Sequence, residues 1–220
     1  MKRLIIFLLI SFIFLSSSAQ AQNKGYYISG NAGVTLLSDA KLETNNIEFG
    51  DYSSNPGFNV GAALGYNFGS FRLEGEVAYH RNEMDEITQN SVLVGCSPNC
   101  VEPINGSISA ISYMINGYYD FHLTNSGLVP YLGAGLGAAT VIVNDKQLSG
   151  NNDDIVFAYQ IAGGVGYKIN PKMTLTAGYR YFATTESEFD VSGVIGFGVA
   201  STVFTEVESH EIMLGLRYQF

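Results

Sequence analysis

The feature that most constrains this chain is a series of eight segments in which apolar and polar residues alternate with a period of two. These segments span residues 26–36, 58–68, 71–80, 108–121, 129–143, 155–169, 173–183 and 210–220. Alternation of this period places successive side chains on opposite faces of a β-strand. In the last segment, His210–Phe220, one face is apolar and the other is mixed polar. Strands of this kind and about ten residues long suit a bilayer, where each one must pair with another strand.

The connections between the segments alternate between long polar stretches and short turns. The long stretches cover residues 37–56, 81–107, 144–154 and 184–209, and the short turns lie at residues 69–70, 122–127 and 170–172. An even number of strands with connections that alternate in this way is typical of outer-membrane barrels. A soluble antiparallel sandwich is the structural alternative. Tyr and Phe at the outward ends of the segments favour the membrane, because aromatic residues gather at its interfaces. The predicted fold is therefore all-β, an eight-stranded antiparallel up-and-down transmembrane β-barrel.

The first 21 residues are predicted to be a signal peptide. Lys2 and Arg3 precede an apolar core of 12 residues, Leu4–Leu15, and Ala19–Ala21 form an A-x-A cleavage site. This core is shorter than the roughly 20 residues that a spanning helix needs. We expect an exported protein with a signal peptide at residues 1–21 and a barrel domain at residues 22–220.

The composition of the chain restricts which kinds of partner and which kinds of site it can have. The chain is 46% hydrophobic, only 14% charged, and contains 25 glycines, which suits a barrel with a lipid-facing band. Residues 22–220 hold 9 basic and 20 acidic residues, which argues against nucleic acid as a partner. Export makes a local disulfide between the two cysteines, Cys96 and Cys100, the expected state, since a metal site would need two further ligands.

The charged residues within the predicted strands all fall on the inward face. They are Arg72, Glu74, Glu76, Asp120, Lys168, Arg180, Glu211 and Arg217. Side chains fill the interior of an eight-stranded barrel, so inward charges must pair. We expect a network that joins Glu74 and Glu76 to Arg180 and Arg217. The inward faces of three segments are mostly Gly and Ala, which leaves room for ordered water. The network is then either a structural plug or a polar path for water and small ions.

Signals for enzymatic chemistry are weak. Gly133–Gly137 and Gly163–Gly166 are similar to phosphate-binding loops, but neither opens a helix after a strand. His80, His122 and His210 lie at strand ends or turns, with no Ser and acid at the spacing of a catalytic triad. The sequence therefore predicts neither an enzyme nor a cofactor.

The long connections are the other candidate functional regions. They hold 16 of the 20 acidic residues. Val191–Phe204 stands out because it is an apolar, Gly-rich run in an otherwise acidic connection. This run is either a hairpin that extends its two flanking strands or a contact surface for a partner.

Five motifs resemble the surface-antigen or opacity-protein family of OmpA-like, porin-like barrels. They are SYMINGYYDF (Ser112–Phe121), PYLGAGLG (Pro130–Gly137), AYQIAGGVGYKI (Ala158–Ile169), LTAGYRYF (Leu175–Phe182) and EIMLGLRYQF (Glu211–Phe220). The resemblance implies an outer-membrane protein, exported through the periplasm, with roles in adhesion, antigenicity or envelope integrity. It also implies that the barrel-assembly machinery reads the terminal aromatic residue, Phe220.

The expected function is that of a surface-exposed structural barrel whose long acidic loops contact a host or surface ligand. The expected partners also include outer-membrane lipid and lipopolysaccharide, and the expected state is a monomer. The alternative function is a narrow porin-like channel for water or small solutes.

Overall fold

The computed structural model describes residues 24–37, 40–44, 47–89, 100–123, 126–145, 153–185, 187–191, 201–205 and 207–220. The predicted signal peptide and Cys96 lie outside these residues, so cleavage after Ala21 and the Cys96–Cys100 disulfide stay predictions. Within the described part of the chain, no helix is long and apolar enough to cross a bilayer.

The described residues form twelve strands. They are β1 (Gly25–Leu37), β2 (Ala40–Thr44), β3 (Ile47–Ser54), β4 (Gly57–Asn67), β5 (Phe71–Gln89), β6 (Cys100–Asp120), β7 (Leu128–Asp145), β8 (Asp153–Lys168), β9 (Met173–Thr184), β10 (Ser187–Val191), β11 (Ser201–Thr205) and β12 (Glu208–Gln219).

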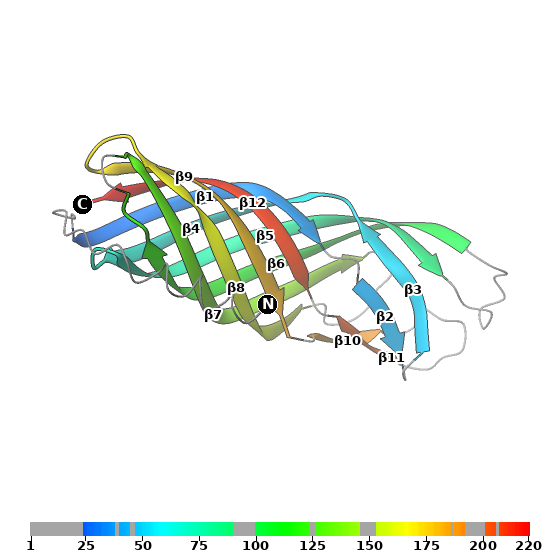
Figure 1. Ribbon diagram of the computed structural model, residues 1–220. Coiled ribbons are helices and arrows are strands. Elements are labelled where there is room, and N and C mark those ends of the chain that lie inside the picture. The colour runs from blue at the N-terminus through cyan, green and yellow to red at the C-terminus, as the bar shows by residue number, and fades with distance from the viewer. Residues whose placement is uncertain are drawn as a thin grey trace, which may run out of the picture.

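Eight of these strands close into an antiparallel barrel in the order β1, β4, β5, β6, β7, β8, β9 and β12 (Figure 1). β12 closes the ring against β1, with Tyr27 opposite Gln219 and Leu37 opposite Ser209. The predicted all-β, eight-stranded transmembrane barrel is confirmed, and the last predicted segment forms its closing strand. The end with the β4–β5, β6–β7 and β8–β9 connections is called the short-turn end below, and the opposite end the long-loop end.

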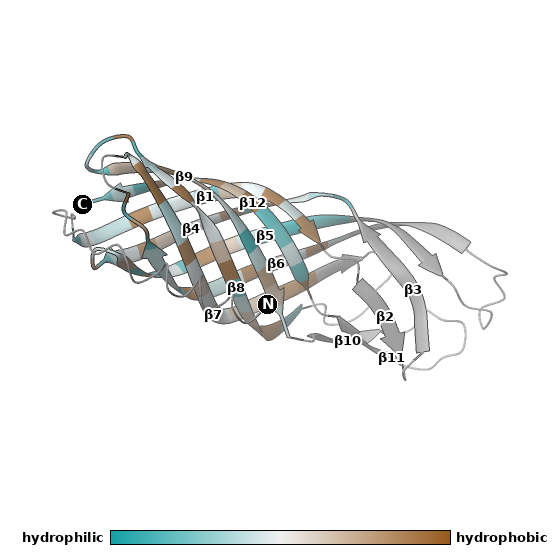
Figure 2. Ribbon diagram, viewed as in Figure 1, coloured by the Kyte–Doolittle hydropathy of each residue, from teal (hydrophilic) through white to brown (hydrophobic). Residues whose placement is uncertain are grey.

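The predicted inward and outward faces are also confirmed. In β4, Asn59 and Ala63 are buried, whereas Val60 and Leu64 are 49% and 59% exposed. Apolar and polar residues alternate along the barrel strands in Figure 2. Exposed aromatic rings contact one another near the short-turn end, where Tyr26 packs against Tyr66 and Tyr66 against Phe68. The wall therefore has the apolar outer surface and aromatic rim that a bilayer requires.

The strands are longer than the alternation predicted. β5 has 19 residues and β6 has 21, and their pairing continues to Gln89 opposite Cys100. The predicted loop at residues 81–107 is thus partly strand, and the predicted loop at residues 37–56 contains β2 and β3. Beyond the membrane neither face has to be apolar, so the hydropathy signal disappears although the backbone pairing continues.

A two-stranded sheet lies at the long-loop end. Ser187–Val191 pairs with Ser201–Thr205, and β2 and β3 lie at the same end of the barrel (Figure 1). This pairing supports the hairpin interpretation of Val191–Phe204, of which residues 192–200 lie outside the described residues.

Candidate functional site

The interior of the barrel contains many buried polar and charged side chains, which are packed in layers. The most deeply buried side chains include Arg180, Tyr27, Gln160 and Glu211. Each comes from a different strand, because inward residues of neighbouring strands meet at the same height. The layers follow one another from the short-turn end to the long-loop end.

The first layer, nearest the short-turn end, is built on Arg72 and Asp120. Arg72 Nε lies 2.9 Å from Asp120 Oδ2, and Nη2 lies 2.9 Å from Oδ1, so the pair is bidentate. The Arg72 guanidinium also lies over the Tyr118 ring, 4.6 Å from its centroid. Arg217 Nη1 lies 3.7 Å from Asp120 Oδ2. One carboxylate therefore serves two guanidinium groups, an arrangement typical of a rigid ion-pair cluster.

Above this layer, Glu74 is held mainly by a tyrosine. The Tyr27 hydroxyl donates to Glu74 Oε2 at 2.7 Å, whereas Arg72 Nη1 is 4.0 Å from the same oxygen. Tyr27 is fully buried, and its ring fills the space in front of Gly65, where a Cβ atom would collide with it.

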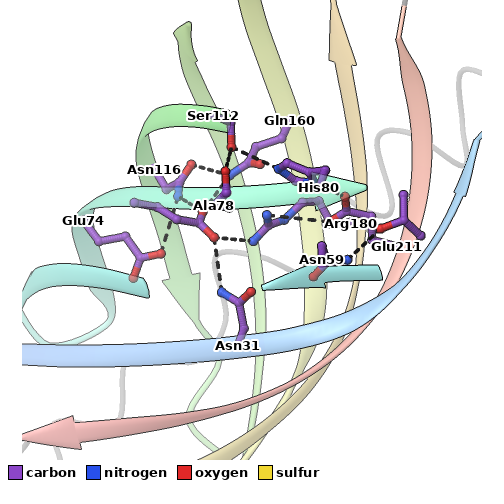
Figure 3. A network of polar contacts seen from close by, with 12 residues as sticks. Asn31, Asn59, Glu74, Ala78, His80, Ser112, Asn116, Gln160, Arg180 and Glu211 are labelled. Carbon is purple, nitrogen blue, oxygen red and sulfur yellow. Dashed lines mark hydrogen bonds and ion pairs between the residues drawn. The ribbon is translucent and has the colours of Figure 1, made fainter. Parts of the chain in front are cut away.

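The central layer surrounds Glu76 with four donors. Arg180 Nη2 lies 2.7 Å and Asn31 Nδ2 3.2 Å from Oε1. Asn116 Nδ2 lies 2.7 Å and Gln160 Nε2 3.1 Å from Oε2. Figure 3 shows Arg180, Gln160, Asn116 and Asn31 converging from different strands on this point. A buried carboxylate with this many donors has its charge and its lone pairs satisfied.

The next layer joins His80, Glu211 and Ser112. His80 Nδ1 lies 2.7 Å from Glu211 Oε1, and Nε2 lies 3.0 Å from Ser112 Oγ (Figure 3). An ionised carboxylate only accepts, so the tautomer that fits an ionised Glu211 has its proton on Nδ1. Arg180 Nη1 lies 3.6 Å from Glu211 Oε2 and links this layer to the central one.

An apolar cluster closes the lumen toward the long-loop end. It consists of Met114, Ala139, Val141, Val156, Ala158, Phe182 and Val207. The Phe182 ring stacks on the His80 ring with a centroid distance of 4.8 Å. Any path through the barrel would have to cross this cluster as well as the ion pairs.

The Gly and Ala faces predicted from the sequence are occupied by long side chains from other strands. Besides the Tyr27–Gly65 contact, Tyr118 covers Gly133, Asn116 covers Gly135, and the Tyr131 hydroxyl lies against Gly164. A cavity of about 60 Å³ remains in the half near the short-turn end, between the first and central layers. A space of this size and polarity has room for a few ordered waters.

The structure brings together seven of the eight predicted lumen charges. Lys168 is the exception, because it is exposed at the short-turn end and none of the ion pairs among the described residues includes it. Its place as the last residue of β8 puts it beyond the closed interior. Arg217 is also paired differently than expected, since its carboxylate partner is Asp120 rather than Glu74 or Glu76.

The uncharged members of the network were not predicted from the sequence; they are Tyr27, Asn31, Ser112, Asn116 and Gln160. His80 was not expected in the network either, because it was interpreted as lying at a strand end or turn. The sequence does contain one signal for these residues: the period-two alternation places each of them on the inward face of its strand. The height at which residues meet depends on the register of the barrel, and alternation alone does not give it.

The contacts of Ser112, His80 and Glu211 follow the order of nucleophile, base and acid in a catalytic triad. Ser112 and Glu211 have no exposed surface. The cavity next to His80 is only about 10 Å³ and borders Ala110 and Phe182. A substrate therefore cannot reach Ser112, and the three residues form a structural hydrogen-bonded chain.

The other sequence features that suggested chemistry have structural explanations. Gly133–Gly137 lies inside β7 and Gly163–Gly166 inside β8. His122 lies in the β6–β7 connection, where burial lowers the pKa of its imidazole. Among the described residues, no group of three or more His, Cys, Asp or Glu residues is arranged to hold a metal ion.

The fold and the lumen define a class: transmembrane β-barrels with an apolar outer wall and a packed polar interior. The chain belongs to the family described as outer membrane protein beta-barrel domain, whose model matches residues 5–220. It is therefore an outer-membrane protein.

Individual relatives agree with this assignment. The chain is 24% identical over 243 residues to the outer membrane protein PagN of Salmonella typhimurium, with 100% of both chains covered. It is 24% identical over 229 residues to major surface antigen 4 of Anaplasma marginale, covering 96% of this chain and 78% of that protein. The crystal structure of Neisserial surface protein A has the same fold, with a TM-score of 0.51, 23% identity, and coverage of 90% of this chain and 100% of that one.

Proposed function

We propose that this protein is a closed, non-conducting barrel that displays an acidic surface outside the cell for contact with host or surface partners. It also supports envelope integrity and is not an enzyme. The observation that carries the proposal is the separation between a lumen that is crossed by buried ion pairs and an apolar cluster and a strongly charged long-loop end. Sequence similarity to a protein named as a major surface antigen supports display at the cell surface.

The charge of the long-loop end selects its partner. Among the described residues, 13 acidic residues lie in segments at this end, together with two basic residues, Lys41 and Arg81. The β5–β6 extension alone contains Glu83, Asp85, Glu86 and Glu102. A surface of this sign repels polyanions and attracts basic proteins or peptides. The partner outside the cell is therefore a basic surface.

Other expected contacts complete the proposal. The outer wall contacts membrane lipid and lipopolysaccharide, and the barrel functions as a monomer because its strands already close on themselves. Phe220 is the residue that the barrel-assembly machinery reads, and its ring packs on Tyr218 with a centroid distance of 5.6 Å.

The channel alternative has less support. A conducting path would need a continuous aqueous lumen, but Arg180 is 2% exposed and Phe182 1% exposed across the middle and upper layers. Opening the path would require breaking buried ion pairs, each of which costs several kcal/mol to separate.

The acidic surface can be tested with a defined basic probe, a fluorescent oligolysine peptide, added to the protein in nanodiscs of zwitterionic lipid. The variant Glu83→Gln/Asp85→Asn/Glu86→Gln/Glu102→Gln should bind the peptide at least about tenfold more weakly, and salt should weaken wild-type binding. Lys172→Gln at the opposite end is the control and should bind as wild type does. Equal binding by the quadruple variant and wild type would remove the basis of the proposal.

A further inference from the structure

A cluster of polar aromatic residues lies on the outer wall near the long-loop end, on β8, β9 and β12. The rings of Tyr159 and Tyr181 have a centroid distance of 6.4 Å, and those of Tyr181 and His210 a distance of 5.4 Å. The Tyr179 hydroxyl is hydrogen-bonded to His210 Nδ1. Glu208 lies two residues before His210 on the same face of β12. These five residues are called the tyrosine–histidine cluster below.

The register of the strands makes the cluster continuous. His210 is directly opposite Tyr181 on β9, and Glu208 is opposite Ala183, which is in turn opposite Tyr159 on β8. On the other side, His210 is opposite Leu36 of β1. The cluster is thus a patch across three adjacent strands that meets a purely apolar surface at β1.

An ordinary aromatic rim accounts for the tyrosine rings but not for the imidazole and the carboxylate. Tyr and Trp at a membrane interface direct their hydroxyl or N–H groups to water. Here a tyrosine hydroxyl is directed sideways to a histidine on the wall that faces lipid. No hydrogen bond among the described residues engages His210 Nε2. Tyr181 is hydrogen-bonded to Glu208 within the cluster. The patch therefore offers His210 Nε2 and the remaining lone pairs of the Glu208 carboxylate and the tyrosine hydroxyls to a ligand that approaches along the wall.

The chemistry of the patch selects a saccharide over a phosphate. None of its members is a lysine or arginine, and Glu208 would repel an anion. Aromatic rings provide flat faces for the C–H surface of a sugar, while the carboxylate accepts hydrogen bonds from hydroxyl or amide groups. Below the patch, Ile212 and Leu214 are each 65% exposed and continue the apolar wall. A ligand with a sugar headgroup and acyl chains matches both parts.

We propose that the tyrosine–histidine cluster binds the acylated amino-sugar headgroup of a glycolipid in the outer leaflet. This inference rests on the lipopolysaccharide contact proposed above and assigns it to one sector of the wall. Tyr179, Tyr181 and His210 contact the sugar, Glu208 accepts from it, and the acyl chains lie along Ile212 and Leu214.

The test measures lipid binding to the folded protein by native mass spectrometry, with hexa-acylated lipid A and phosphatidylglycerol as competing probes. Wild type should prefer lipid A by about tenfold or more, and lipid A without its phosphates should keep that preference. A soluble glucosamine disaccharide without acyl chains should bind at least about tenfold more weakly than lipid A.

The variant His210→Phe/Glu208→Gln keeps an aromatic ring on the wall and should reduce the preference for lipid A about tenfold. The matched control is Tyr79→Phe on β5, an outer-wall tyrosine that packs against Phe58 and lies 3.2 Å from Ser109. The control should show the same preference for lipid A as the wild-type protein. Folding of each variant is checked by gel mobility before and after heating.

Equal binding of lipid A and phosphatidylglycerol, or loss of binding on removal of the phosphates, would overturn the saccharide assignment. Equal affinity for the soluble disaccharide would assign the site to free glycans instead and contradict the glycolipid. If one of these results is obtained while the wild-type protein still binds the oligolysine peptide, only the glycolipid inference fails and the proposed acidic-surface function stands.

Discussion

At the scale of single residues, the interior is organised by carboxylates that each collect several donors. Glu76 contacts Arg180, Asn31, Asn116 and Gln160, so its removal affects four strands at once. Buried ion pairs of this kind add little net stability compared with an apolar core, but breaking one leaves an uncompensated charge.

Glu76→Ala should therefore destabilise the barrel by about 3–5 kcal/mol, because Arg180 would stay buried with Glu211 at 3.6 Å as its remaining carboxylate. The free energy of unfolding is measured by urea titration of the barrel in lipid vesicles. Glu83→Ala, at an exposed position of the same strand, is the control and should change stability by less than about 0.5 kcal/mol.

The double variant Glu76→Leu/Arg180→Met should recover part of the loss, because it removes both charges, whereas Asn31, Asn116 and Gln160 still lose their bonds to Glu76. An unfolding midpoint of Glu76→Ala equal to that of Glu83→Ala would contradict the structural importance of the central layer.

The sequence predicts the residues of the interior network only in part. Charged residues on the inward face were identified because the sequence of a single strand shows both the charge of a residue and the face on which it lies. Their partners were not, since Arg217 meets Asp120 through the register of several strands. The neutral members, such as Gln160 and Tyr27, give no composition signal that distinguishes them from ordinary strand residues.

At the scale of strands, small residues have different roles on the two faces of the wall. Inward glycines accept long side chains from other strands, as Gly65 accepts Tyr27. Outward glycines face lipid, and a Cβ at Gly75 would meet nothing within 4 Å. The same residue type is therefore required on one face and replaceable on the other.

Gly65→Ala should destabilise the barrel by about 1–3 kcal/mol, because the added methyl group overlaps the buried Tyr27 ring. Gly75→Ala is the matched variant on the neighbouring strand and should be neutral or slightly stabilising, since alanine loses less backbone entropy on folding. Urea titration in vesicles compares the two. A larger loss for Gly75→Ala than for Gly65→Ala would show that the inward packing is described wrongly.

Strand existence and orientation were predictable because the bilayer imposes a strict apolar and polar alternation. Strand length was not, as β5 and β6 show. The β5–β6 pairing continues from Met84 to Gln89 and from Cys100 to Gly106, past the last β4–β5 pair, Phe58 opposite Arg81. In these residues the sequence no longer alternates regularly, so the hydropathy pattern no longer reports the backbone conformation.

At the scale of the whole molecule, charge is divided along the barrel axis. The long-loop end is acidic. The lumen contains Arg72, Arg180 and Arg217 together with four carboxylates. The short-turn end carries Lys24, Lys168 and Lys172. The lumen is also divided, with ion pairs toward the short-turn end and an apolar cluster toward the long-loop end. Both divisions suit a barrel that displays a surface and does not conduct.

The central claim is that side chains close the lumen, and single-channel recording tests it most directly. Purified, folded protein is reconstituted into a planar bilayer, with a porin of known conductance as the positive control. The cavity of about 60 Å³ does not extend through the apolar cluster around Phe182, so no discrete conductance steps are expected at any voltage that the porin control tolerates. Reproducible steps from the wild-type protein would contradict the account and establish the channel in its place.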